Sequence, residues 1–523
     1  MSLRARVVLV VVALVASSVV TGAASTRSRC AGLVGVLPGA VVTDAALVAA
    51  SDTEGEHCDV RGLVAPRIRF HLKLPTDYSG RYLQLGCGGF CGELAPPTPR
   101  ACGTVPGDLA VATTDDGHTG AGDVPSVDAS WAGDRQARDD WQFRAPHVVS
   151  RTAKDVIARY YGAPPTFSYF SGCSGGGREA LLLAQRHPEA FDGIAAGAPA
   201  VQLSALIVHQ AWLARVTTDP RGNPVLTADR LPGLHAAVLA RCDHLDGLTD
   251  GQLDDPRACD FDPAALLCPA GGAACLTPAQ VEAVRKLYDG PRTPDGQRLH
   301  PAGQARGSEL AWNRWIVPTA EGALAARLAD QYLRHLAHPL GAPHTTLADF
   351  RFTAAEFHRL TAEGLRANAM STDLTAFHRA GGKLLMWHGW GDEAIPAAGL
   401  LDYHARLTAR YPRGLSDWAR VFMVPSLHHC GRGETLTSFD PLPDLIRWTE
   451  HGAAPDRITA HGHAPNGTPR SRPVFPYPLR ATYDGTGSTD DAANFTPTPP
   501  ATPPRDAVDW LGAHLHRLPG PVG

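Results

Sequence analysis

The sequence predicts a protein of the α/β class, with a mostly parallel sheet that a large inserted domain interrupts. Between residues 55 and 200, short apolar segments alternate with helical patterns, as βαβ units do. From about 201 to 375 the strand-like segments fade, and cysteine loops, Pro/Gly turns and amphipathic helices replace them. Strand-like segments return at 383–387 and 421–424. We therefore expect a sheet domain built from residues 26–200 and 376–523, with residues 201–375 inserted between its two parts.

Periodicity defines the expected elements. Alternating polar and apolar residues predict strands, and apolar residues three or four positions apart predict helices. The strands are expected at 67–74, 81–85, 109–113 and 166–170, and the helices at 148–160 and 178–187. The tail from 465 to 505 is rich in Pro, Thr, Gly and Asp, so we expect coil there and a last helix at 506–516.

The composition excludes two classes of protein. The 523 residues carry 48 Lys+Arg against 52 Asp+Glu, a net charge of −4, which leaves no basic field for binding nucleic acid. A hydrophobic content of 44% is too high for a disordered polyelectrolyte.

The N-terminus has the pattern of a secretory signal. Arg4 and Arg6 precede an apolar stretch at 7–20, and small residues follow at 21–25. We therefore expect residues 1–25 to be a signal peptide and the mature protein to be secreted, without a membrane segment. An uncleaved membrane anchor is the alternative. Eleven cysteines agree with an oxidising compartment, and the odd number leaves at least one unpaired or paired between chains.

Ser174 is the candidate nucleophile. It lies in Gly172-Cys173-Ser174-Gly175-Gly176, a G-x-S-x-G motif between an expected strand and an expected helix. This is the context of a nucleophile elbow, where small neighbours permit a strained turn. A serine in an ordinary strand-to-helix turn is the alternative.

A serine nucleophile needs a base and an orienting acid, which follow it in the chain in the order acid, then histidine. Asp392 follows the strand at 383–387, with Glu393 as its competitor, and His428-His429 follow the strand at 421–424. Cys173 directly precedes Ser174, and Cys430 directly follows His429. A disulfide between them would hold nucleophile and base side by side; two unrelated cysteines are the alternative.

These segments resemble the tannase and feruloyl esterase family. The resemblance extends over residues 169–180, 184–188 and 191–200 around the serine, over His388-Gly389-Trp390-Gly391-Asp392, and over His429-Cys430-Gly431-Arg432-Gly433. It runs through nearly the whole mature chain. It implies an α/β-hydrolase core with a lid domain at 201–375, and a Cys173–Cys430 disulfide beneath the catalytic triad.

The resemblance also implies a reaction, the hydrolysis of esters of aromatic acids such as feruloyl or galloyl esters, free or attached to a plant polymer. Ser174 is expected to attack the carbonyl, His429 to move the proton and Asp392 to orient His429. The expected oxyanion donors are the amides of Gly175 and, by resemblance, Gly89 in the glycine-rich segment 86–89. A plain turn is the alternative for that segment. It departs from the family's common form by carrying Cys87 and Cys91, and Cys91–Cys102 is one expected cross-link.

An acidic segment in the inserted domain is a candidate calcium site. Residues 242–259 contain five aspartates between two cysteines. Calcium takes carboxylate and carbonyl oxygens, here expected from the side chains of Asp243, Asp246 and Asp250 and the carbonyls of Leu248 and Gln252. A solvated acidic loop is the alternative, and the family resemblance favours a structural Ca²⁺. By the same resemblance we expect three disulfides, Cys242–Cys259, Cys268–Cys275 and Cys30–Cys58.

Substrate choice is expected to depend on the inserted domain. Trp312 and Trp315 are candidate walls for a flat phenolic acyl group, although both fit a domain core equally well. Arg306 and Arg314 are candidates for meeting an acidic substituent. Feruloyl, galloyl, coumaroyl and terephthaloyl groups are not separated by the sequence. Two other functions stay open, an amidase or peptidase using the same triad and a non-catalytic secreted binding protein on the same scaffold.

Overall fold

The structure, a computed structural model, describes residues 26–96, 104–268 and 275–517. The expected signal peptide and Cys102 lie outside these residues. The central sheet has ten strands in the order β1-β2-β3-β4-β6-β5-β7-β8-β9-β10. From β6 to β10 neighbouring strands are parallel, and β1 to β4 add an antiparallel extension that ends on β6.

The strands agree with the expected positions where the sequence alternates or is strongly apolar. Their bounds are β1 Gly35–Leu37, β2 Ala40–Val48, β3 His57–Val64, β4 Ile68–Pro75, β5 Arg81–Leu85, β6 Ala110–Thr114, β7 Phe167–Cys173, β8 Gly193–Gly197, β9 Lys383–Gly389 and β10 Ala419–Val424. The antiparallel strands β1 to β3 and the short strand β8 were not among the expected elements. The Gly-Ala-rich β8 has small side chains and little β propensity.

Both faces of the sheet are covered, as a parallel sheet requires. Leu384 and Met386 of β9 belong to the cluster on one face, whereas Leu385 and Trp387 belong to the cluster on the other. The first face is covered by α3 (Ala145–Tyr161), α4 (Gly175–Arg186) and α11 (Ala398–Arg410), and the second by α12 (Leu442–His451). A short helix α2 (Arg135–Asp139) precedes α3.

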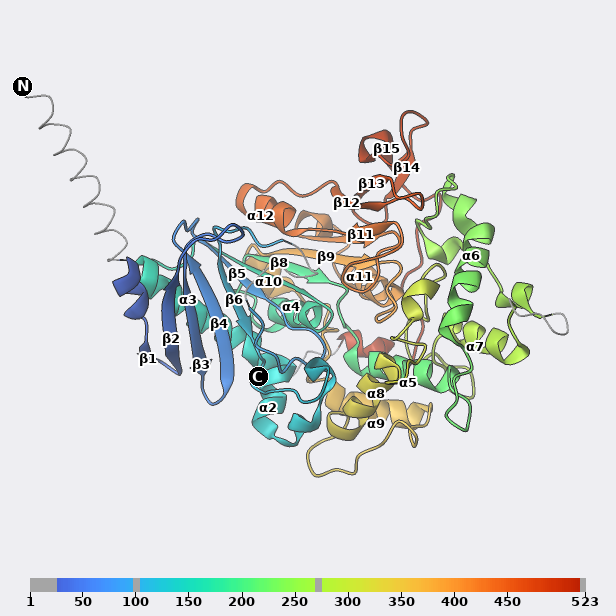
Figure 1. Cartoon of the computed structure of the whole chain (residues 1–523), viewed down its shortest axis with the longest axis horizontal. Helices are drawn as coiled ribbons and strands as arrows, with labels where there is room; N and C mark the ends of the chain where they lie inside the picture. The colour runs from blue at the N-terminus through green and yellow to red at the C-terminus, as the bar shows by residue number, and fades with distance from the viewer. Residues whose placement is uncertain (1–25, 97–103, 269–274, 518–523) are drawn as a thin grey trace, which may run out of the picture.

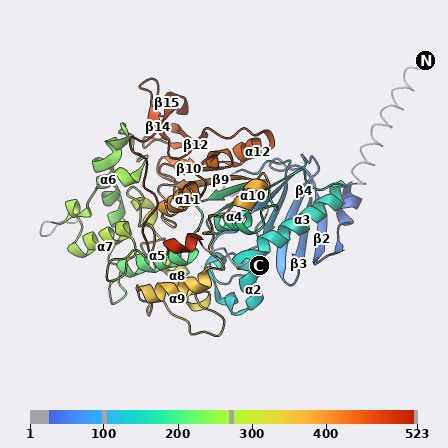
Figure 2. The same cartoon turned by 180° about the vertical axis from the view of Figure 1, so that it is seen from behind.

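A helical segment separates β8 from β9 in the chain but not in the sheet. The two strands pair directly, from Gly193–Lys383 to Gly197–Trp387. The intervening helices are α5 Leu203–Val216, α6 Leu231–Cys242, α7 Pro278–Asp289, α8 Leu324–His335, α9 Ala354–Gly364 and α10 Thr375–Arg379. Helices α5 to α9 gather on the side of the molecule away from β1 to β3 (Figures 1 and 2). Residues from α5 to α8 form a separate apolar core.

The tail is more ordered than the sequence predicts. Strands β11 (Leu436–Ser438), β12 (Ile458–His463) and β13 (Pro469–Val474) form a small sheet, and β14 (Arg480–Tyr483) pairs with β15 (Phe495–Thr498). The expectation of coil at 465–505 was therefore wrong. Two buried positions of β13 are arginines that form ion pairs with Asp250, so the strand shows no alternation of apolar residues. Of the expected last helix at 506–516, only residues 513–516 are helical, within the 3-10 helix Ala513–Arg517.

Disulfides tie the fold together. Three of the expected pairs are present, Cys30–Cys58, Cys242–Cys259 and Cys268–Cys275. Within the described ranges, no helix combines the length and apolar character needed to cross a bilayer.

Candidate active site

Ser174 lies on a sharp turn between β7 and α4. Its backbone has φ 63° and ψ −122°, a left-handed conformation that a serine adopts only under constraint. The turn is fixed by the Ser174 N–H, which donates to the Gly197 carbonyl at 3.0 Å. A Cβ on Gly172 would lie 2.6 Å from the carbonyl carbon of Gly176, so only glycine fits there. The small neighbours in the motif are thus required by backbone packing.

The structure brings the three predicted residues together from three strand ends. His429 Nε2 lies 2.9 Å from Ser174 Oγ, and His429 Nδ1 lies 2.9 Å from Asp392 Oδ2. With the carboxylate ionised, Nδ1–H donates to Asp392 and Nε2 accepts from the serine hydroxyl. Glu393 has a different place, since its carboxylate accepts the backbone N–H of His429 at 3.1 Å. Asp392, and not Glu393, therefore contacts the imidazole.

Asp392 is fully buried yet stays ionised. Its Oδ1 accepts the N–H groups of Ala394 at 2.8 Å and Ile395 at 2.7 Å, and its Oδ2 accepts from His388 Nε2 at 2.9 Å. Burial alone would raise the pKa of Asp392, but the neighbouring histidines His429 and His388 hold it below the ordinary value. Burial would lower the pKa of His429, and the Asp392 carboxylate outweighs it, so that pKa is raised well above the ordinary value.

Two segments that line the cavity beside the serine carry backbone amides without an acceptor among the described residues. Gly175 opens α4, so its N–H has no partner within the helix. The second segment is residues 86–91, here called the glycine loop. Its amides at Cys87, Phe90 and Cys91 are engaged, whereas among the described residues none accepts from Gly88 or Gly89.

The cysteines of the glycine loop pair with each other. Cys87 and Cys91 form a disulfide, so the expected Cys91–Cys102 link is wrong. The expected Cys173–Cys430 disulfide is also absent. Cys430 is a free thiol that packs against the apolar cluster containing Cys173, whereas Cys173 is already disulfide-bonded and has no sulfur valence left for it.

A cavity of about 370 Å³ opens beside the triad. The glycine loop, Ser174, Gly175 and His429 line its reactive end. The other apolar side chains that line it are Val124, Val127, Ala200, Leu203, Leu206, Ile207, Trp315, Leu324, Leu328, Ala394 and Ile395. Among the residues that the structure describes, no lysine or arginine lines it, and Glu93 is the one carboxylate at its wall. Neither Arg306 nor Arg314 is among its walls.

The two candidate tryptophans have different places. Trp315 lines the cavity, with its ring centroid 5.8 Å from that of His429, and its Nε1–H donates to Gln210 Oε1 at 3.1 Å. Trp312 is fully buried in the core of the inserted domain and does not line the cavity. Its assignment to substrate binding was therefore wrong, because its indole packs inward and donates to Ser308.

Some functional contacts were missed from the sequence. The motif at 388–392 gives no sign that His388 supports Asp392 from the end of β9. Gln210 of α5 holds Trp315 on one side and donates to the Ala394 carbonyl at 2.6 Å on the other. A polar residue inside an apolar helix was the available signal for Gln210.

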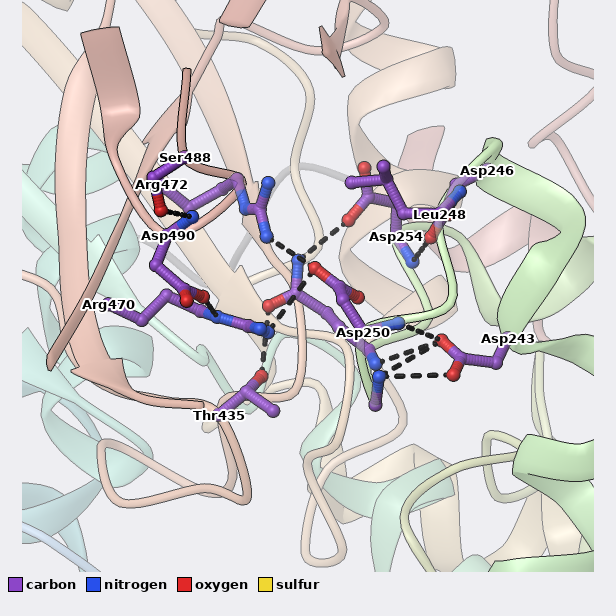
Figure 3. Close-up of polar contacts among 12 residues, drawn as sticks. Asp243, Asp246, Leu248, Asp250, Asp254, Thr435, Arg470, Arg472, Ser488 and Asp490 are labelled. Carbon is purple, nitrogen blue, oxygen red and sulfur yellow. Dashed lines mark hydrogen bonds and ion pairs between the residues drawn. The ribbon is translucent and has the colours of Figure 1, made fainter. Parts of the chain in front are cut away.

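The acidic segment offers calcium's donor types but does not gather them. The Asp243 carboxylate accepts backbone N–H groups from residues 250–252, and Asp250 is ion-paired to Arg470 and Arg472, as Figure 3 shows. Among the described residues, no three carboxylates of this segment have oxygens within 4.8 Å of one another. Burial and the neighbouring Asp254 raise the pKa of Asp246 to about 7, which marks uncompensated negative charge. The donor chemistry fits a cation, and the carboxylates must shift to share one.

Sequence comparisons place the chain in a family. The family model for tannase and feruloyl esterase matches residues 52–498. A mono(2-hydroxyethyl) terephthalate hydrolase from Piscinibacter sakaiensis is 34% identical over 514 residues, covering 84% of each chain. A probable feruloyl esterase B-2 from Aspergillus flavus is 30% identical over 411 residues, covering 74% of this chain and 75% of that protein.

Solved structures share the fold. Feruloyl esterase B from Aspergillus oryzae superposes with a TM-score of 0.79 at 24% identity, covering 90% of this chain and all of that one. Tannin acyl hydrolase from Aspergillus niger superposes with a TM-score of 0.70 at 20% identity, covering 90% and 94%. These matches establish the α/β-hydrolase fold. Together with the family match, they show that this chain is a carboxylic ester hydrolase of the tannase and feruloyl esterase family.

Proposed function

We propose that this protein is a secreted serine esterase. It cleaves esters, free or attached to a plant polymer, whose aromatic acyl group carries no charge. The contact of Ser174 Oγ with His429 Nε2 at 2.9 Å, beside an apolar cavity of about 370 Å³, carries the proposal. A cavity of this size suits one aromatic acyl group. The disulfides of the described residues fit an oxidising compartment.

The reaction proceeds through an acyl-enzyme. Ser174 Oγ attacks the ester carbonyl while His429 Nε2 takes its proton, and Asp392 stabilises the resulting imidazolium. The carbonyl oxygen becomes an oxyanion that accepts hydrogen bonds from the Gly175 and Gly89 amides. The tetrahedral intermediate collapses, the C–O bond breaks and His429 protonates the leaving alkoxide. Water then repeats the sequence on the acyl-serine, which releases the acid and restores the serine.

The lining of the cavity favours uncharged acyl groups. An acyl group with a free carboxylate would be desolvated there, and the described part of the cavity wall offers it Glu93 but no lysine or arginine. Feruloyl and coumaroyl groups carry no such charge. Trp315 and the leucines of α5 and α8 provide flat apolar walls for their rings. We therefore place phenolic cinnamoyl esters ahead of a terephthalate monoester as substrates.

The decisive experiment compares matched esters with the purified mature protein. We expect turnover of methyl ferulate that is lost in Ser174→Ala, with methyl gallate assayed alongside. Bis(2-hydroxyethyl) terephthalate and its monoester present the same ring, and the monoester has a carboxylate where the diester has a second neutral ester. We expect the neutral diester to have a kcat/KM at least about tenfold higher, because a buried unpaired carboxylate is costly. Equal values would refute the charge selectivity, and no ester turnover by the folded protein would refute the esterase assignment.

We also propose that a calcium ion stabilises the acidic segment, using the carboxylates of Asp243, Asp246 and Asp250 and the carbonyls of Leu248 and Gln252. The donor types and the raised pKa of Asp246 support it. The ion would supply charge compensation and rigidity in the inserted domain, and no catalytic step involves it.

A further inference from the structure

The glycine loop rests on two buried acids that the reaction itself does not use. Glu179, on α4 one turn beyond the nucleophile, accepts the Cys87 N–H on its Oε2 at 3.1 Å. Asp116 follows β6, and one of its carboxylate oxygens lies within 4.8 Å of the sulfurs of both Cys87 and Cys91. The Asp116 side chain is fully buried and that of Glu179 nearly so. The pair thus lies directly beneath the loop that offers the Gly89 amide.

The two acids satisfy each other by sharing a proton. Both Asp116 oxygens and Glu179 Oε1 are buried without an N–H or O–H donor among the described residues. Burial first, and then the charge of Glu179, raise the pKa of Asp116 well above its ordinary value. Asp116 is therefore the protonated member and donates its hydrogen bond to Glu179. The single negative charge that remains faces the buried Arg178, which attracts it.

The loop has few other supports near its exposed amides. The Phe90 N–H donates to the Ser126 carbonyl at 2.7 Å, and the Cys91 N–H closes a turn onto Gly88 at 3.0 Å. Besides that turn, Gly88 and Gly89 are held among the described residues by the chain itself, by the Cys87–Cys91 disulfide and by the close packing of Gly89 on the Ser126 backbone. A shift of Cys87 is therefore passed directly to the Gly89 amide, two residues away.

We propose that Asp116 and Glu179 are positioning residues, a proton-sharing pair that holds the Cys87 amide and so aims the Gly89 amide at the oxyanion. The inference rests on the proposed function, because it assigns the glycine loop to transition-state stabilisation. Donors held in place before the reaction cost no reorganisation when charge develops. Loss of the pair should therefore weaken binding of the transition state more than binding of the substrate.

The test uses variants that differ in hydrogen bonding but little in size. Asp116→Asn supplies an amide N–H in place of the carboxylic O–H, so we expect kcat on methyl ferulate within about twofold of wild type. Asp116→Ala removes the donor but keeps the Glu179–Arg178 pair, and we expect kcat to fall by about tenfold with KM unchanged. Glu179→Ala should lower kcat further, whereas Glu179→Gln keeps a carbonyl for the Cys87 N–H and should lose less.

A second readout separates positioning from general damage. An arylboronic acid forms a tetrahedral adduct on the serine, and ferulate itself binds as the planar product. In Asp116→Ala we expect boronate affinity to fall by the same factor as kcat, while ferulate affinity stays within twofold. Equal losses for both ligands, or an Asp116→Asn variant as impaired as Asp116→Ala, would overturn the proposal. If Glu179→Ala does not fold, the comparison of Asp116→Asn with Asp116→Ala decides whether the proposal holds. Failure of the proposed function itself would show separately, as absence of ester turnover in the wild type.

Discussion

Adding a single methyl group at Gly176 should change the position of the oxyanion donors, and so kcat, while leaving the stability of the fold nearly unchanged. Its Cβ would lie 2.8 Å from the Gly86 carbonyl carbon and 3.0 Å from the Cys87 nitrogen, where ordinary contact begins at 3.4 Å. These are backbone atoms, so they cannot rotate away. The glycine loop must therefore retreat from α4 by about 0.6 Å. Because a displacement of about 1 Å can reduce a rate about a hundredfold, we expect Gly176→Ala to lower kcat by about tenfold.

The assay is steady-state hydrolysis of methyl ferulate together with a thermal melt. Alanine is preferred to glycine within a helix by about 1 kcal/mol, so part of the strain is offset and Tm should change little. KM should stay within twofold, since the walls proposed for the ring, Trp315 and the leucines of α5 and α8, are separate from the glycine loop. The matched control is Gly233→Ala in α6, another glycine within a helix, where a Cβ meets nothing within 4 Å. An unchanged kcat in Gly176→Ala, or an equal loss in Gly233→Ala, would refute the reasoning.

Two further predictions test the base and the cavity wall. His429 must be neutral to accept the serine proton, and its pKa is raised, so kcat/KM should fall as the pH drops below a midpoint above about 6.5. Asp392→Asn should move that midpoint down and lower kcat by up to about 10⁴-fold. A wild-type midpoint below about 6.5 would contradict the assignment. Trp315→Ala should reduce kcat/KM for methyl ferulate more than for p-nitrophenyl acetate, with little change in Tm. Trp312→Ala should instead destabilise the fold by about 3–5 kcal/mol. The reverse pattern would contradict the placement of Trp315 at the cavity wall and of Trp312 in the core.

The sequence predicts this fold where burial of side chains follows a simple period. Strands β4 to β7, β9 and β10 were expected because their apolar residues alternate or run together. Strand β8 was not, since the small residues of Gly193–Gly197 pack in the sheet centre without a strand-like composition. In β13, Arg470 and Arg472 are buried and form ion pairs with acids from elsewhere in the chain, so the local sequence does not indicate a strand.

The candidate site was predicted as far as motif order and strand ends allow. Parallel strands end at one edge of the sheet, so residues following β7, β9 and β10 were expected to meet, and Ser174, Asp392 and His429 do. Pairing among cysteines is a different problem, because it depends on which sulfurs approach in three dimensions. The Cys87–Cys91 pair shows this, because Cys91 pairs with a cysteine four residues away and not with the expected Cys102.

The last prediction concerns competition for Asp250. Its carboxylate is an expected calcium ligand, but in the structure Arg472, which is 1% exposed, donates to it at 2.6 Å and Arg470 lies at 3.3 Å. Two cations cannot both have the full attraction of one carboxylate, so calcium binding must weaken the arginine contact. Arg472→Gln should then bind calcium more tightly than wild type, and its melting temperature should rise more when calcium is added.

Differential scanning calorimetry with chelator or with saturating calcium measures this difference. The baseline of Arg472→Gln should be lower, because the ion pair is lost, so only the calcium-induced rise is compared. Asp250→Asn should lose most of the rise, since a neutral amide is a weaker ligand than a carboxylate. If both variants respond to calcium as the wild type does, Asp250 is not a ligand, and its role is to bind the inserted domain to β13 through the two arginines.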